Sequence, residues 1–347
     1  MASRSVDTRY RRAPRLALLW HDGALRCVIA ETGASCRVSS DLVRLLDEAS
    51  KPGTVQELAS CAMIGRQIVH RAIEVGLLEP ETTEHPPELD DWGTFELAVQ
   101  RRMGVGRKRS NPDRSRVPSP LMNVPGPEIS LQPPTRLASE EPRFAEVLRQ
   151  RRSRRHFSPH PLPFAALSEL LICACGLQSV DGRTGTVRRP FPSGGCRHSL
   201  ELYVAAMHVE DLPPNCYYFN PAGSLVPLAG LEGFTDKLER LTLRQIAESQ
   251  VTPVRPPAAV VLVTSIFART FWKYQDLGLT LVHKDVGCLY QTLYLQATAQ
   301  GLGGFAVGGG PEATFARALG LDPVRHSYVG AFVLGKVEVS DEGTTGG

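Results

Sequence analysis

The sequence lacks several features that would assign it directly to a class of protein. Its 347 residues include 39 basic and 36 acidic ones, and the net charge of +3 is too small to indicate nucleic-acid binding. The longest apolar stretch, residues 258–268, contains Thr264 and Ser265 and falls well short of the ~20 residues that span a bilayer. The apolar run at 16–20 is shorter than the roughly 7–15 residues of a secretory signal. We therefore expect a cytoplasmic protein with no membrane segment.

Motifs of disulfide scaffolds, metal sites and hydrolases are missing as well. None of the eight cysteines forms a C-x-x-C pair, and Cys196 and His198 lack further ligands at the spacing of a zinc site. No G-x-S-x-G and no H-E-x-x-H motif occurs. The glycines at 301–306 resemble a dinucleotide fingerprint, but they follow a predicted helix and precede a predicted strand. This context excludes a Rossmann site, and we expect reduced cysteines and no metal.

The composition is that of a globular protein, with 42% hydrophobic and 22% charged residues. At roughly 150 residues per domain, the length predicts two domains. Residues 15–85 predict a hairpin with Asp22 and Gly23 at its turn, followed by three short helices, which together suggest a winged-helix-like module. This module has ten acidic and seven basic residues, the wrong balance for binding DNA phosphates. We expect it to bind a peptide or to pack against the rest of the protein.

Residues 86–138 are basic and then proline-rich, and they predict a linker. Residues 139–340 predict a second domain in which helices and strands do not alternate strictly, so we assign the α+β class. We expect its helices at 140–151, 163–176, 231–248, 284–300 and 311–319, and its strands at 200–209, 216–227, 258–267, 303–307 and 327–337.

Four segments of this second domain carry residues suited to binding or chemistry. Residues 151–155 place four arginines and a serine beside the end of a helix, and guanidinium forks suit a phosphate monoester. Residues 189–195 combine prolines with Gly194 and Gly195, which let a flat ring approach backbone N–H groups. Residues 301–310 hold six glycines, and Lys273 and Tyr274 form a titratable pair after the apolar strand.

The motifs R-R-S-x-R-x-F at 151–157, R-x-x-P-S-G-G at 189–195, Lys273-Tyr274, D-x-G at 285–287 and G-L-G at 301–303 occur in this order. Together they resemble the nitroreductase superfamily and, more closely, the SagB-type azoline dehydrogenases that modify ribosomally made peptides. This resemblance implies a nitroreductase-like FMN-binding fold, with a mixed central sheet flanked by helices. It also implies a homodimer whose two subunits share each flavin site.

The resemblance assigns roles to individual residues. Lys273 and Tyr274 would act in proton removal, and Arg151, Arg152, Ser153 and Arg155 would hold the FMN phosphate. Pro192, Ser193, Gly194 and Gly195 would line the isoalloxazine ring, with Gly308 and Gly309 near its hydride-accepting N5 and Gln291 as a weaker contact. One position departs from the simple nitroreductases, which usually carry Asn where this chain has Cys196.

The resulting hypothesis is an FMN-dependent dehydrogenase that oxidises thiazoline or oxazoline rings of a peptide to thiazole or oxazole, working with a cyclodehydratase. Lysine serves as the base only if burial or a neighbouring cation lowers its pKa from its ordinary value of about 10. Two alternatives stay open. The first is a flavin oxidoreductase acting on a carrier-bound or free small molecule such as an enone, a quinone or a nitroaromatic. The second is a flavin-free scaffold that docks a leader peptide.

Overall fold

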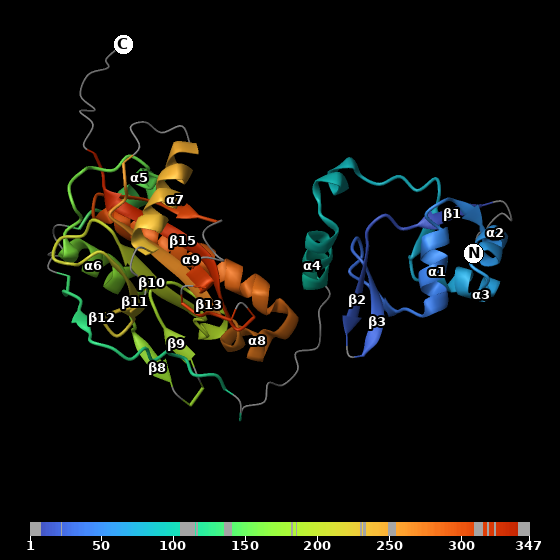
Figure 1. Ribbon diagram of the computed structural model, residues 1–347, viewed down its shortest axis with the longest axis horizontal. Coiled ribbons are helices and arrows are strands. Elements are labelled where there is room, and N and C mark those ends of the chain that lie inside the picture. The colour runs from blue at the N-terminus through green and yellow to red at the C-terminus, as the bar shows by residue number, and fades with distance from the viewer. Residues whose placement is uncertain are drawn as a thin grey trace, which may run out of the picture. The chain divides into compact units, whose positions relative to one another are not determined.

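The computed structural model describes residues 8–104, 115, 117–134, 141–229, 231, 234–248, 255–308 and 315–338, apart from positions 22, 182, 185, 318 and 323. The chain divides into two compact units, Met1–Lys108 and Arg109–Gly347 (Figure 1). No helix among the described residues is long and apolar enough to cross a bilayer.

The N-terminal unit contains the predicted hairpin and three helices. Its strands are β1 (Arg9–Arg12), β2 (Leu16–His21), β3 (Ala24–Ile29), β4 (Ser35–Arg37), β5 (Gly53–Thr54) and β6 (Leu78–Pro80). They form the small antiparallel sheets β5-β1-β6 and β2-β3-β4. The helices α1 (Ser40–Glu48), α2 (Val55–Cys61) and α3 (Arg66–Glu74) bury one apolar face each, and α2 starts with a capping box between Thr54 and Glu57. The hairpin and the three helices are thus present, and the winged-helix-like assignment stays a prediction.

The predicted linker is structured at both ends, which corrects our expectation for residues 86–138. The short 3-10 helix η1 (Pro87–Asp91) is followed by α4 (Thr94–Gly104), and Leu97 and Ala98 of α4 are buried against Val28 and Ala30 of the hairpin region. Further on, β7 (Ile129–Ser130) already belongs to the second unit and pairs with another strand of that unit. The helix and strand propensities of this polar stretch did not predict η1, α4 or β7, because a few contacts with residues distant in sequence stabilise them.

The C-terminal unit is built on a seven-stranded sheet of order β14-β15-β13-β10-β11-β12-β7. The strands are β10 (Leu200–Ala206), β11 (Asn215–Asn220), β12 (Ser224–Pro227), β13 (Ala259–Ile266), β14 (Leu302–Val307) and β15 (His326–Lys336). Every pair between these described strands is antiparallel. Residues 216–227 form two strands rather than one, because the chain turns back at Pro221 and Gly223.

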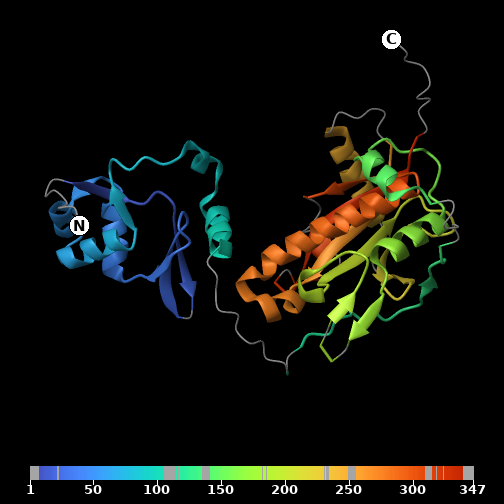
Figure 2. The same cartoon turned by 180° about the vertical axis from the view of Figure 1, so that it is seen from behind.

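Both faces of this sheet are covered, which explains why its central strands are apolar at nearly every position. The helices α6 (Phe164–Cys175) and α9 (Gly278–Ala299) pack on one face, where α9 crosses in front of the sheet in Figure 2. The helix α7 (Phe234–Glu248) and Phe315 cover the other face. The remaining elements are α5 (Phe144–Gln150), the hairpin β8 (Ser179–Asp181) and β9 (Thr186–Arg188), the 3-10 turns η4 (Gly194–Cys196) and η5 (Gln275–Leu277), and α8 (Ala268–Tyr274).

Candidate functional site

The P-S-G-G loop is held in place by a buried carboxylate on α9. Ser193 Oγ donates a hydrogen bond to Asp285 Oδ2 at 2.6 Å, and Gly194 N donates to Asp285 Oδ1 at 3.0 Å. Ser193 Oγ also accepts from the backbone N–H of His198 at 2.9 Å. Gly195 follows in a left-handed conformation with φ of 63°, which glycine adopts without strain. The loop is therefore held at Ser193 and Gly194 and turns sharply at Gly195.

Lys273 and Tyr274 reach this loop from α8, a helix that the sequence pattern did not predict. A Cβ atom added to Gly195 would lie 3.1 Å from Lys273 Nζ and would overlap the hydroxyl oxygen of Tyr274. Lys273 Nζ itself lies 5.4 Å from the centre of the Tyr274 ring. The structure thus brings the predicted catalytic pair to the predicted ring-binding loop, although 77 residues of sequence separate Gly195 from Lys273.

Arg197 connects this loop to its surroundings. Its Nη1 donates to the carbonyl of Thr184 at 2.8 Å, and its Nε donates to the carbonyl of Arg269 at 3.2 Å. The guanidinium lies 4.7 Å from the centre of the Trp272 ring, a cation–π contact. Burial lowers the pKa of Arg197, and the nearby Tyr274 opposes this change. Arg197 therefore ties the loop to α8 and to the β8–β9 turn.

A buried charge network lies behind the loop. Arg269 Nη1 donates to Glu201 Oε1 at 2.6 Å, and Glu201 Oε2 accepts from the hydroxyl of Tyr218 at 3.0 Å. Arg269 and Glu201 are almost fully buried, at 2% and 1% of side-chain exposure. Burial, together with the charges of Arg189 and Arg269, lowers the pKa of His198 to about 3. His198 is therefore neutral at physiological pH.

The predicted phosphate-binding residues lie along a more C-terminal part of α9. Ser153 Oγ is 2.8 Å from the hydroxyl of Tyr294, which also accepts from the Ala306 N–H of β14 at 2.8 Å. The Arg151 guanidinium lies 5.2 Å from the centre of the Tyr294 ring, and that of Arg155 lies 5.0 Å from the centre of the Phe305 ring. Among the described residues, none of these guanidinium groups, nor that of exposed Arg152, forms an ion pair. Their charge suits an external anion such as a phosphate.

The glycine segment 301–310 is described only in part. Gly308 is exposed, and it follows Val307, whose carbonyl accepts from the Tyr290 hydroxyl of α9 at 3.1 Å. Gln291 is the next residue along α9 and is also exposed. Gly309 lies outside the described residues, as does most of the helix expected at 311–319.

The helix α9 therefore joins three motifs that the sequence keeps apart. Asp285 holds the P-S-G-G loop, Tyr290 bonds to the end of β14, and Tyr294 bonds to Ser153. Residues 285 and 294 are separated by about 13 Å along the helix axis, at 1.5 Å per residue. The arrangement fits an elongated ligand with a flat part at the glycine loop and an anionic part at the arginines. Sequence reasoning missed Asp285, Tyr290 and Tyr294 as site residues, although Asp285 belongs to the D-x-G motif.

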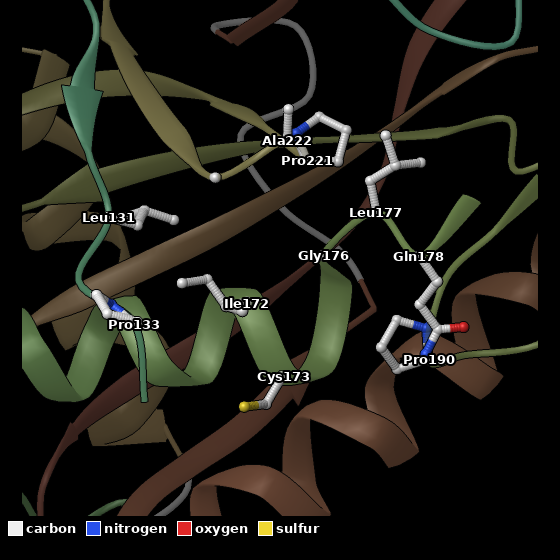
Figure 3. Close-up of a pocket in the computed structure, with 11 residues that line it drawn as sticks. Leu131, Pro133, Ile172, Cys173, Gly176, Leu177, Gln178, Pro190, Pro221 and Ala222 are labelled. Atoms are coloured by element: carbon white, nitrogen blue, oxygen red, sulfur yellow. The ribbon is translucent and has the colours of Figure 1, made fainter. Parts of the chain in front are cut away.

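A hollow in this unit lies beside the predicted motifs. It has a volume of about 450 Å³ and is shown in Figure 3. The end of α6, the β11–β12 turn and the segment after β7 line it, with Ile172, Cys173, Pro190, Pro221 and Leu131 among its residues. It borders Pro190 of the R-x-x-P-S-G-G motif but none of the residues to which the resemblance assigns a role.

Comparison with known proteins decides the family. The Nitroreductase family model matches residues 148–336, more than half of the chain. The chain belongs to the nitroreductase family. A nitroreductase of Methanocaldococcus jannaschii is 30% identical over 169 residues, which cover 49% of this chain and 80% of that protein. The Escherichia coli microcin B17-processing protein McbC is 25% identical over 143 residues, covering 40% of this chain and 50% of McbC.

Solved structures also resemble this nitroreductase-family chain. A nitroreductase structure from Ralstonia eutropha has 21% identity and a TM-score of 0.46, covering 66% of this chain and 99% of that one. The E. coli microcin synthetase McbBCD complex, with truncated pro-MccB17 bound, has 24% identity and a TM-score of 0.45, covering 55% of this chain and 70% of that one. The family assignment confirms the predicted nitroreductase-like fold and makes the protein an oxidoreductase of this family. The SagB-type assignment stays a prediction.

Proposed function

We propose that this protein is an FMN-dependent dehydrogenase that oxidises thiazoline or oxazoline rings in a peptide to thiazole or oxazole. The observation that carries the proposal is the convergence of Lys273 and Tyr274 on Gly195. A basic and a phenolic group thereby face the loop to which the family resemblance assigns the flavin ring. The similarity to McbC, a protein that processes microcin B17, supports a peptide as the substrate.

The described residues fit FMN. Arg151, Arg152, Ser153 and Arg155 would hold the phosphate, because these guanidinium groups have no carboxylate partner in the described part of the chain. Pro192, Ser193, Gly194 and Gly195 would line the ring, with Gln291, Gly308 and Gly309 at its other contacts. When bound, FMN supplies the two-electron acceptor of the reaction.

The chain's own residues supply the proton chemistry. Lys273 Nζ, when unprotonated, would take one ring proton from the substrate, and the hydride lost from the neighbouring ring carbon would go to bound FMN, so that the ring loses two hydrogens and gains a double bond. The Tyr274 hydroxyl lies at the same loop and orients the ring for this transfer. Arg197 holds α8 against the loop through the Arg269 carbonyl and the Trp272 ring, and thereby keeps both side chains in position.

The N-terminal unit offers a place for the rest of the peptide. A groove of about 340 Å³ lies between β4 and α3, lined by apolar residues that include Leu42, Ile68 and Leu77. Among the described residues that line it, the charged ones are Arg37 and Arg71, although the module as a whole is acidic. We propose that this groove binds a peptide segment, that a cyclodehydratase supplies the azoline substrate, and that the enzyme acts as a homodimer.

Mass spectrometry of a precursor peptide tests this function. The peptide is treated with a cyclodehydratase, with and without this protein, and azoline oxidation appears as a loss of two hydrogens per ring. Lys273→Ala should abolish this loss while bound FMN, measured by its absorbance, is retained. Unchanged turnover of the variant would refute the role of Lys273.

One alternative has a specific observation in its favour. The M. jannaschii protein, which is named for nitroreductase activity, matches this chain at higher identity than McbC does, and this supports a nitroaromatic as the substrate. Turnover of nitroaromatics or quinones, combined with no change in the cyclised peptide, would establish this alternative. A purified protein that takes up no FMN would instead favour the peptide-docking scaffold.

A further inference from the structure

Asp285 differs from the other strongly buried acid of this unit in having no cationic partner. Its residue is 4% exposed, and among the described residues it forms no ion pair. Glu201, by contrast, pairs with Arg269 at 2.6 Å. Both oxygens of Asp285 are instead used by the P-S-G-G loop, through Ser193 Oγ and Gly194 N.

A buried carboxylate is an energetically unfavourable group for holding this loop. Burying an unpaired charge is unfavourable, whereas a neutral amide oxygen accepts the same Gly194 hydrogen bond with a smaller desolvation penalty. Burial accordingly raises the pKa of Asp285, and the bonds from Ser193 and Gly194 oppose the rise. A negative charge at this position also acts on its neighbours with little screening by solvent.

The contacts also determine which donors the loop presents. Asp285 takes the Ser193 hydroxyl and the Gly194 N–H, while the Cys196 N–H donates to the Ser193 carbonyl at 3.0 Å. Among the described residues, the N–H of Gly195 has no acceptor. Gly195 is also the residue that Lys273 and Tyr274 approach. A ring placed on this loop therefore meets one free N–H and has a negative charge behind it.

We propose that Asp285 is a positioning residue that fixes the loop so that Gly195 presents its N–H to the cofactor, and whose charge lowers the reduction potential of the bound flavin. This inference rests on the proposed binding of FMN. Reduction adds electrons to the ring, and a nearby fixed anion makes that addition less favourable.

The test compares Asp285→Asn with Asp285→Ala in the full-length, FMN-bound protein. Asn keeps an acceptor for Gly194 and removes the charge, so we expect FMN affinity within threefold of wild type and a higher midpoint potential. Ala removes both acceptors, and we expect at least tenfold weaker FMN binding. Asp236→Asn is the matched control, since Asp236 is an exposed acid on α7 of the same unit. Asp236→Asn should change neither the FMN affinity nor the midpoint potential.

A further variant should shift the midpoint potential of the bound flavin in the opposite direction from Asp285→Asn. Ser193→Ala removes a donor that partly neutralises the carboxylate, so the midpoint potential should fall. An unchanged potential in Asp285→Asn would overturn the electrostatic part of the proposal. Unchanged FMN affinity in Asp285→Ala would overturn the positioning part.

Failure of the proposed function can be told apart from failure of this inference. If the wild-type protein binds no FMN, the effect on potential is refuted together with the function. The positioning part is then decided by hydrogen exchange in the FMN-free protein. Faster exchange of the Gly194 amide in Asp285→Ala than in Asp236→Asn supports it, and equal exchange overturns it.

Discussion

Replacing Gly195 with alanine tests whether the catalytic pair and the P-S-G-G loop form one site. The φ of 63° at this position costs an alanine about 1–2 kcal/mol. The new Cβ would also lie 3.1 Å from Lys273 Nζ and overlap the Tyr274 hydroxyl. Gly195→Ala therefore combines a backbone cost with a displacement of both predicted catalytic side chains.

Gly320 provides a control that separates these two effects. Its φ is 61°, and a Cβ added there meets no heavy atom within 4 Å. Gly320→Ala thus carries the backbone cost alone. At about 2–4 °C per kcal/mol for a unit of this size, Gly320→Ala should lower Tm by about 2–8 °C, and Gly195→Ala should lower it by at least as much.

Activity should distinguish the two variants. A shift of roughly 1 Å in a catalytic group can cost about 100-fold in rate, so we expect Gly195→Ala to reduce azoline turnover 10- to 100-fold and Gly320→Ala to leave it unchanged. Thermal unfolding, bound FMN and loss of two hydrogens from the peptide are measured on the same samples. Wild-type turnover by Gly195→Ala, with FMN bound, would show that Lys273 and Tyr274 do not act at this loop.

Two further predictions concern the buried network behind the loop. Arg269→Met leaves the Glu201 carboxylate with the Tyr218 hydroxyl as its remaining side-chain hydrogen-bond partner. The free energy of unfolding, measured by denaturant titration, should fall by about 3–5 kcal/mol, and a fall below about 1 kcal/mol would contradict the pairing. The pKa of His198 is lowered to about 3 in the folded protein. Below about pH 6.5 the His198 imidazole therefore binds a proton in the unfolded chain but not in the folded one. The free energy of unfolding should accordingly fall by about 2 kcal/mol between pH 7 and pH 5. His198→Gln should remove this part of the pH dependence, and an equal slope in wild type and variant would refute it.

Much of the fold could be predicted because local patterns decide where elements form. The alternation and length of apolar runs predicted the strands at 200–209, 258–267 and 327–337, and the structure places β10, β13 and β15 there. The helical spacing of residues 284–300 predicted α9, although the helix starts earlier, at Gly278. Its C-terminal end was recognisable because Gly301 adopts a positive φ just after it.

The candidate site was predicted as a set of motifs but not as an arrangement. R-R-S-x-R and P-S-G-G were identified through their residue types and order, and the family match confirms the nitroreductase part of the resemblance that they indicated. The helix α8 was missed because Lys273 and Tyr274 directly follow an apolar strand, and seven residues are too few to show a helical period. The element α4 was missed because its contacts with Val28 and Ala30 are distant in sequence.

The sequence by itself determined the family, the class of fold and the residue types available for binding a phosphate and a flat ring. These depend on local order, periodicity and composition, which can be read along the chain. Only the tertiary structure decided that α9 joins the motifs through Asp285, Tyr290 and Tyr294, and that Gly195 faces Lys273 and Tyr274. Such contacts form between side chains that the sheet and helices bring within a few ångströms of one another. The number of residues between two positions in the sequence does not determine the distance between their side chains in the folded protein.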